Sequence, residues 1–166
     1  MLLKKNKFNN ILYFYCFILL FFSCNHLASS DLHTKGLLIY KKANCSSCHF
    51  WHANGGNSHG GAAPSLRNTE LSSEELYYVI KCGRLGTNMP YFGRSNKKKF
   101  CKNSNNIEGN NSLISLRGHK LLYDEEILLL TNFIRDEIKN KPITKRYCIE
   151  FFGKKTNNCK EFNKSN

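Results

Sequence analysis

The segment Cys45–His49 has the sequence CSSCH, and it constrains this chain more than any other feature of its 166 residues. Two thiols three positions apart can each add to one vinyl group of the same porphyrin, forming two thioethers. A histidine directly after the second thiol is placed to ligate the iron from one face. This spacing is typical of c-type haem attachment and is far more specific than a bare CxxC pair. We therefore predict one covalently bound haem c, held through Cys45, Cys48 and His49.

The first 30 residues have the three-part pattern of a secretory signal peptide. Three lysines precede an apolar run at 11–22, and small or polar residues occupy 23–30. The run is shorter than the roughly 20 apolar residues of a membrane span, and cleavage is expected after Ala28 or Ser30. Because there is no clean A-x-A site, retention of this segment as an anchor stays open. The sequence FFSC at 21–24 also loosely resembles a lipoprotein signal.

Residues 31–166 have the length of one domain, which we divide into a body at 31–140 and a C-terminal tail at 141–166. Three of the 25 basic residues and none of the 12 acidic residues fall in the leader, which leaves a formal charge of +10 for the remainder. In an exported chain this excess favours an acidic protein partner or an anionic membrane surface over nucleic acid. The bacterial periplasm is the expected compartment, with membrane association through the N-terminus as a further option.

The chain contains eight cysteines, of which two lie in or beside the leader and two belong to the CSSCH segment. Four remain: Cys82, Cys101, Cys148 and Cys159. An even number in an oxidising compartment favours two disulfides. Three pairings are open, and we favour the local one, which joins Cys82 to Cys101 and Cys148 to Cys159.

Apolar spacing and end signals predict helices but no strands. Three helices are expected, at about residues 35–43, 72–83 and 125–139. Ser72 and Glu75 form a capping box for the second helix, and Asp124 is the N-cap candidate of the third. The segments 49–66 and 93–112 are polar and rich in turn residues, which indicates loops. We therefore expect an all-α domain, with the tail packed back on it and held by a disulfide.

The iron face opposite His49 has one methionine candidate after the leader, Met89, which is followed by Pro90. Its loop includes Gly86 and has no amphipathic helix to bury it, which favours a haem ligand over a core residue. The competing histidines are His33, His52, His59 and His119. Of these, His119 is the strongest alternative for bis-His ligation.

A second residue is expected to act on His49 itself. A ligating histidine normally donates its other ring N–H to a carbonyl or carboxylate, which fixes the orientation of the ring. Proline has no N–H to donate but keeps its carbonyl, so Pro64 is a candidate for this role. A plain turn proline is the alternative interpretation.

At this point the pattern resembles the class I cytochrome c family, over about residues 34–138. The matching segments are the CSSCH motif after a helix, GAAPSL at 61–66, Met89-Pro90, and a C-terminal helix with an aromatic residue at 133. The resemblance implies a helical domain wrapped around one covalent haem, with the Pro64 carbonyl supporting His49 and with Met89 as distal ligand.

The resemblance also implies that the first and last helices cross through Gly36, Tyr40 and Phe133. One departure is that Tyr40 lies five residues before Cys45, whereas the family usually has four, so Ile39 is an alternative for this contact. More narrowly, residues 79–92 and the extra cysteines resemble a subgroup of small exported bacterial cytochromes, which supports two added disulfides.

The leading hypothesis is a one-electron carrier, and so an electron-transfer protein instead of an enzyme. His/Met ligation fills both axial positions and raises the reduction potential relative to bis-His ligation. Five basic residues flank the haem-binding segments as a docking ring for acidic patches on redox partners: Lys41, Lys42, Lys81, Arg84 and Arg94. The alternative is a peroxidase-like haem enzyme or ligand sensor with an open or labile sixth position. A third hypothesis drops haem and takes CxxC as a thioredoxin-type pair or half a zinc site.

Overall fold

The computed structural model describes residues 31–58, 61–94, 101 and 116–163. It divides into two compact units, residues 1–34 and 35–166, and the account below concerns the second. The predicted leader at 1–30 and the competing ligand His59 lie outside the described residues. Within the part of the chain that is described, no helix has the length and apolar character needed to cross a bilayer.

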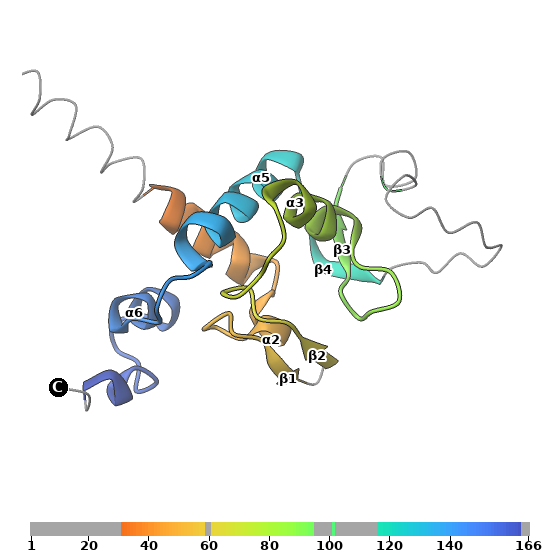
Figure 1. Ribbon diagram of the computed structural model, residues 1–166. Coiled ribbons are helices and arrows are strands. Elements are labelled where there is room, and N and C mark those ends of the chain that lie inside the picture. Colours follow the sequence, from red (N-terminus) through yellow and green to blue (C-terminus); the bar gives the residue numbers. More distant parts are fainter. Residues whose placement is uncertain (1–30, 59–60, 95–100, 102–115, 164–166) are drawn as a thin grey trace, which may run out of the picture. The chain divides into compact units, whose positions relative to one another are not determined.

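Helices dominate the described part of the chain (Figure 1). A first helix at residues 31–42 is followed by α2 (Ser46–His49), α3 (Ser73–Cys82), α5 (Asp124–Phe133) and α6 (Lys145–Phe152). A π-helical turn, η1 (Ile134–Ile138), continues α5, and a short 3-10 turn, η2 (Lys160–Asn163), lies near the C-terminal end. The three predicted helices are therefore present, together with the additional helix α6 in the tail.

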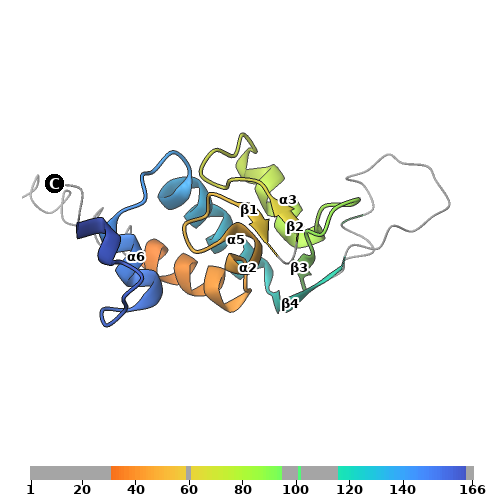
Figure 2. The ribbon, with the colours of Figure 1, turned by 90° about the horizontal axis from the view of Figure 1, so that it is seen from below.

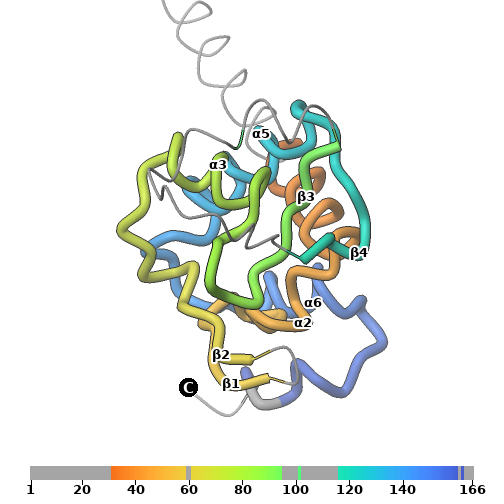
Figure 3. Tube along the Cα trace, turned by 90° about the vertical axis from the view of Figure 1, so that its right-hand side faces the viewer, coloured from red at the N-terminus to blue at the C-terminus, as the bar shows by residue number. Residues whose placement is uncertain are grey.

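Two small sheets correct the expectation of an all-α domain. Strand β1 (Gly56–Ser58) pairs antiparallel with β2 (Gly61–Ala63), and β3 (Tyr91–Gly93) pairs parallel with β4 (Arg117–Leu122) (Figure 3). Three of these strands have only three residues. Such strands are too short to show the period-two alternation from which a strand is predicted.

The ends of α3 follow the sequence signals, whereas the start of α5 does not. The Ser72 hydroxyl accepts the Glu75 N–H at 3.3 Å, and the Glu75 carboxylate accepts the Ser72 N–H at 2.7 Å, so the capping box is confirmed. Helix α5 begins one residue earlier than predicted. Its N-cap is Tyr123, and the side chain of Asp124 instead accepts a hydrogen bond from Lys81.

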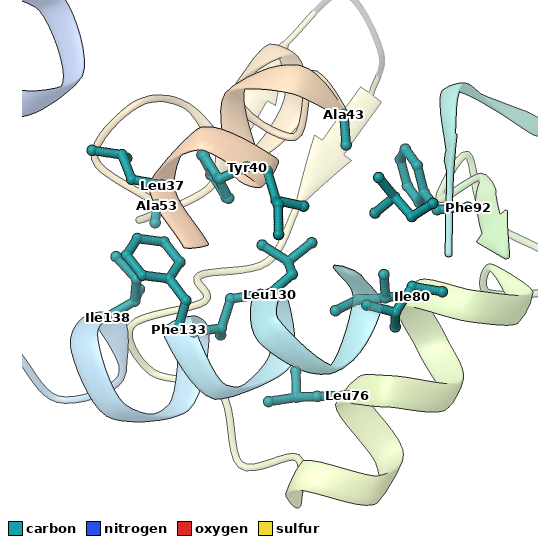
Figure 4. Packing of buried hydrophobic residues seen from close by; sticks show 14 of the residues in the cluster. Leu37, Tyr40, Ala43, Ala53, Leu76, Ile80, Phe92, Leu130, Phe133 and Ile138 are labelled. Atoms are coloured by element: carbon teal, nitrogen blue, oxygen red, sulfur yellow. The ribbon is translucent and has the colours of Figure 1, made fainter. Parts of the chain in front are cut away.

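The first helix crosses α5 at the centre of the core (Figure 4). Tyr40 and Phe133 have no exposed surface, and their ring centroids lie 6.4 Å apart. A Cβ at Gly36 would overlap the Phe133 side chain, so only glycine permits this approach. Tyr40 itself makes the predicted contact, although Ile39 is also buried.

Two disulfides join Cys82 to Cys101 and Cys148 to Cys159, which confirms the local pairing. The second disulfide links Cys148 on α6 to the segment that follows this helix. Helix α6 lies beside the first helix (Figure 2). The Tyr147 hydroxyl donates a hydrogen bond to the Trp51 carbonyl at 2.8 Å, and the two rings stack at 6.1 Å. Lys41 donates to the Phe151 carbonyl. The tail helix therefore contacts the loop that follows the CSSCH segment.

Candidate cofactor site

A cavity of about 520 Å³ brings the sequence-predicted site residues together. Cys45, Cys48, His49, Pro64 and Met89 all line it. Much of the remaining wall consists of apolar side chains from the first helix, α3, β3 and the α5–η1 helix, among them Tyr40, Ala43, Leu76, Ile80, Phe92, Leu130 and Ile134. The volume lies within the roughly 300–1,000 Å³ of typical ligand and cofactor sites. The wall is therefore suited to a large apolar group with a few polar attachment points.

One turn of helix presents the two thiols and the imidazole to this cavity. The Cys45 carbonyl accepts the His49 N–H at 2.9 Å, and residues three and four apart lie on the same side of a helix. Neither Cys45 nor Cys48 forms a disulfide. This geometry allows both thiols and the imidazole to reach one porphyrin.

The Cys45 thiol is poorly suited to redox exchange, and the described residues offer no zinc site. Burial, together with Cys48, raises the pKa of the Cys45 thiol to about 12, whereas a thioredoxin-type pair needs a low-pKa thiolate. Among the residues that the structure describes, no group of three His, Cys, Asp or Glu side chains could hold a metal ion. Both haem-free alternatives therefore lack support in the described residues.

His49 is buried and oriented by a single hydrogen bond. Its Nδ1 lies 3.0 Å from the Pro64 carbonyl oxygen. Because that oxygen can only accept, Nδ1 carries the proton and Nε2 keeps a lone pair for a metal. Burial lowers the pKa of His49 although the bond to Pro64 opposes this shift, so the ring stays neutral at neutral pH.

Glycine allows the loop after His49 to come close to Pro64. Gly55 has a φ of +67°, and a Cβ there would lie 2.6 Å from the Pro64 carbonyl oxygen. The Gly55 N–H donates to the His49 carbonyl, and the Leu66 N–H donates to the Ala53 carbonyl at 2.9 Å. The two sides of the loop therefore hold the proline carbonyl in position for His49.

Met89 occupies a turn that is built on the C-terminal end of α3. Its carbonyl accepts the Arg84 N–H at 3.2 Å, and its own N–H donates to the Thr87 hydroxyl at 3.2 Å. Gly83 has a φ of +74°, and a Cβ there would lie 2.9 Å from the Met89 carbonyl oxygen. The adjoining Cys82 forms the disulfide to Cys101, so the turn is anchored to α3 by both packing and a covalent bond.

The competing histidines differ in position. The His52 ring stacks on Phe50 at 5.4 Å, and its Nδ1 accepts the Asn54 N–H at 3.1 Å, which does not suit a ligand. His119, on β4, lines the same cavity as Met89. His33 belongs to the other unit, so the structure does not place it relative to the cavity. His119 therefore remains the alternative to Met89.

The predicted docking ring needs correction at Lys81. The Lys81 side chain is only 5% exposed, and its Nζ lies 2.9 Å from Asp124 Oδ2 and 3.3 Å from the Tyr77 hydroxyl. A buried, paired ammonium cannot serve as a docking charge. Arg84 is exposed and borders the cavity, and its role as a docking charge stays a prediction.

The amino-acid sequence does not single out Arg67, because a charged residue is expected at the surface by default. Its side chain is buried, and it bonds to backbone carbonyls of the loop after His49 and of the segment around Lys141. A single arginine after GAAPSL carries no motif that predicts burial. Only the tertiary arrangement reveals this residue.

The helical fold and a cavity lined by CxxCH, a proline-bound histidine and a methionine are features of c-type cytochromes. Residues 31–99 match the family described as cytochrome C oxidase, cbb3-type, subunit III. This match supports a c-type cytochrome family for the segment that holds the CSSCH motif, α3 and Met89. Domains of this family bind haem c and are typically electron-transfer proteins instead of enzymes, exported or membrane-associated. No curated protein and no solved structure matches the chain.

Proposed function

We propose that this protein is a periplasmic one-electron carrier with one covalent haem c ligated by His49 and Met89. It would work between redox partners of a respiratory chain or with a periplasmic dehydrogenase. The observation that carries this proposal is the meeting of both thiols, the Pro64-bound imidazole and the Met89 segment in the wall of one cavity.

The residues of the cavity have separate roles in this proposal. Cys45 and Cys48 would hold the haem through two thioether bonds, one to each vinyl group, with each thiol proton passing to the other vinyl carbon. A haem bound in this way supplies an Fe(III)/Fe(II) couple. His49 offers its Nε2 lone pair while Pro64 holds the ring, and Met89 offers its thioether sulfur. The apolar wall formed by residues such as Leu130 limits the access of water.

Electron exchange would require brief contact with a partner that carries acidic patches. Arg84 borders the cavity, and β4 adds exposed Arg117 and Lys120 on either side of His119, which lines it. Cations at the edge of a docking surface mainly speed encounter, and they do so less at high salt. Association with a membrane through residues 1–30 is a second route to such partners.

Expression in cells that mature c-type cytochromes would test the proposal. A pyridine haemochrome assay on denatured protein should show one haem that remains with the chain. The spectrum of the native reduced protein should not change when CO is added. Potentiometry should give a single one-electron step. Loss of haem on denaturation would contradict covalent attachment. Rapid CO or cyanide binding at neutral pH would instead favour the haem enzyme or ligand sensor.

A further inference from the structure

Arg67 is a buried cation whose partners are backbone carbonyls. The residue is 5% exposed. Its Nε donates to the His52 carbonyl at 2.6 Å, and its Nη1 donates to the carbonyls of Lys141 at 2.6 Å and Ile138 at 3.4 Å. The guanidinium also lies 5.3 Å from the centre of the Tyr147 ring. These contacts join the loop after His49, the end of η1 and the tail helix.

Among the residues that the structure describes, no acidic side chain balances the charge of Arg67. Within the described part of the chain no carboxylate forms an ion pair with it, in contrast to buried Lys81, which has Asp124. The carbonyls at the end of η1 and the Tyr147 ring favour a cation there. Burial lowers the pKa of Arg67, but a guanidinium remains charged in proteins at ordinary pH.

This charge lies beside the loop that follows His49. Arg67 directly follows Leu66, which lines the cavity, and it bonds to the carbonyl of His52, three residues after His49. The Arg67 guanidinium opposes the rise that burial causes in the pKa of Tyr40, whose hydroxyl donates to the Phe50 carbonyl directly after His49. The guanidinium is therefore tied to the loop that follows His49, and its charge acts on Tyr40, which lines the cavity.

We propose that Arg67 is a tuning residue whose buried positive charge raises the reduction potential of a haem held by His49. The oxidised form of the centre carries one more positive charge than the reduced form. A nearby cation in a low-dielectric environment disfavours that extra charge, whereas an exposed cation is screened. The inference rests on the proposed haem-binding function and adds to it a residue outside the ligand set.

The test compares midpoint potentials of the wild-type holoprotein with those of R67M, R67K and R146M, measured by potentiometry across a range of pH. Arg146 is a matched control, because it precedes Tyr147 in the chain but is exposed and pairs with Glu150. We expect R67M to lower the potential and R146M to leave it nearly unchanged. R67K keeps a charge without the arginine geometry, so at acidic pH its potential should stay near the wild-type value. As pH rises and the buried lysine loses its proton, the potential of R67K should fall toward that of R67M.

Two results would overturn the proposal. One is an R67M potential equal to that of the wild type, with haem content and ligation spectra unchanged. The other is an R67K potential well below the wild-type value at every pH, because lost hydrogen bonds and not lost charge would then explain the effect. If the R67M protein cannot be produced, the midpoint potential of R67K at acidic pH tests the proposal by itself. Failure of the proposed function would appear separately, as wild-type protein without covalent haem.

Discussion

His49 shows how much of the site depends on one residue and its nearest neighbours. Its ring has a fixed tautomer because the Pro64 carbonyl, 3.0 Å from Nδ1, can only accept a hydrogen bond. Gly55 and Gly83 let backbone approach closely at Pro64 and Met89 respectively. The positions of both axial candidates therefore depend on residues that lack a side chain, which cannot be replaced without moving the backbone.

Gly36 gives a prediction at this scale. G36A should lower the free energy of unfolding by about 1–3 kcal/mol, the usual cost of overpacking, because the new Cβ would overlap Phe133. Denaturant unfolding of the holoprotein measures this. Leu38→Ala on the same helix is the control, since Leu38 is 59% exposed and should change stability by less than about 0.5 kcal/mol. Equal effects of the two variants would refute the predicted helix contact.

Lys81 gives a prediction with a defined pH dependence. Burial alone would lower its pKa, but hydrogen bonds to Asp124 and Tyr77 outweigh burial and raise it above the ordinary 10.5. The protonated Lys81 side chain therefore stabilises the fold fully below pH 10.5. This stabilisation is lost as pH rises through the pKa of Lys81 in the folded protein. Because Asp124 is half-exposed, we expect K81M to cost only about 1 kcal/mol at neutral pH.

Unfolding of wild type and K81M at neutral pH and at strongly alkaline pH checks this sign. The difference between the two proteins should shrink at alkaline pH. A difference that grows with pH would show that the Lys81–Asp124 pair does not stabilise the fold in the way described.

At the scale of elements, the Met89 turn is held between α3 and β3. The Gly83 N–H continues the backbone bonding of α3, and the Tyr91 N–H donates to the Leu116 carbonyl at 2.8 Å. The Cys82–Cys101 disulfide encloses the whole turn. The methionine segment is therefore fixed at both ends and is less free to leave the cavity than an open loop would be.

Removing the disulfides one at a time separates ligand positioning from general stability. The free energy of unfolding should fall by about 3 kcal/mol in each of the variants C82S/C101S and C148S/C159S, as expected for loops of this size. Only C82S/C101S should bind CO faster in the reduced state, because only that disulfide encloses Met89. Stopped-flow CO mixing with urea unfolding measures both effects. Faster CO binding in C148S/C159S instead would contradict this assignment.

The elements also show what could be predicted from sequence and why. The capping box of α3 and the ends of that helix depend on neighbours within four residues, so Ser72, Glu75 and Gly83 were predictable. The N-cap of α5 was not, because Asp124 is drawn to Lys81, 43 residues away. The strands β1 to β3 are too short to show periodicity, and they depend on pairing that local sequence does not encode.

At the scale of the whole second unit, segments far apart in sequence form the site. The CSSCH segment, Pro64 and Met89 could be chosen from spacing, uniqueness and family resemblance, and the structure places all of them at one cavity; their roles as haem ligands stay a prediction. Arg67 could not be chosen, because its burial requires the end of η1 and the tail helix to close over it. Residues that belong to a motif or lie near one in sequence could be predicted as site residues. A charged residue that is buried only by tertiary packing could not.

The measurement that tests the central claim most directly is the ferric spectrum of M89A beside that of H119A, since both residues line the cavity. The wild type and H119A should show low-spin haem with the weak red band of Met–Fe ligation. M89A should lose that band, become high-spin and bind cyanide rapidly. An unchanged M89A spectrum, or loss of the low-spin signature in H119A alone, would contradict His49/Met89 ligation and the carrier function that depends on it.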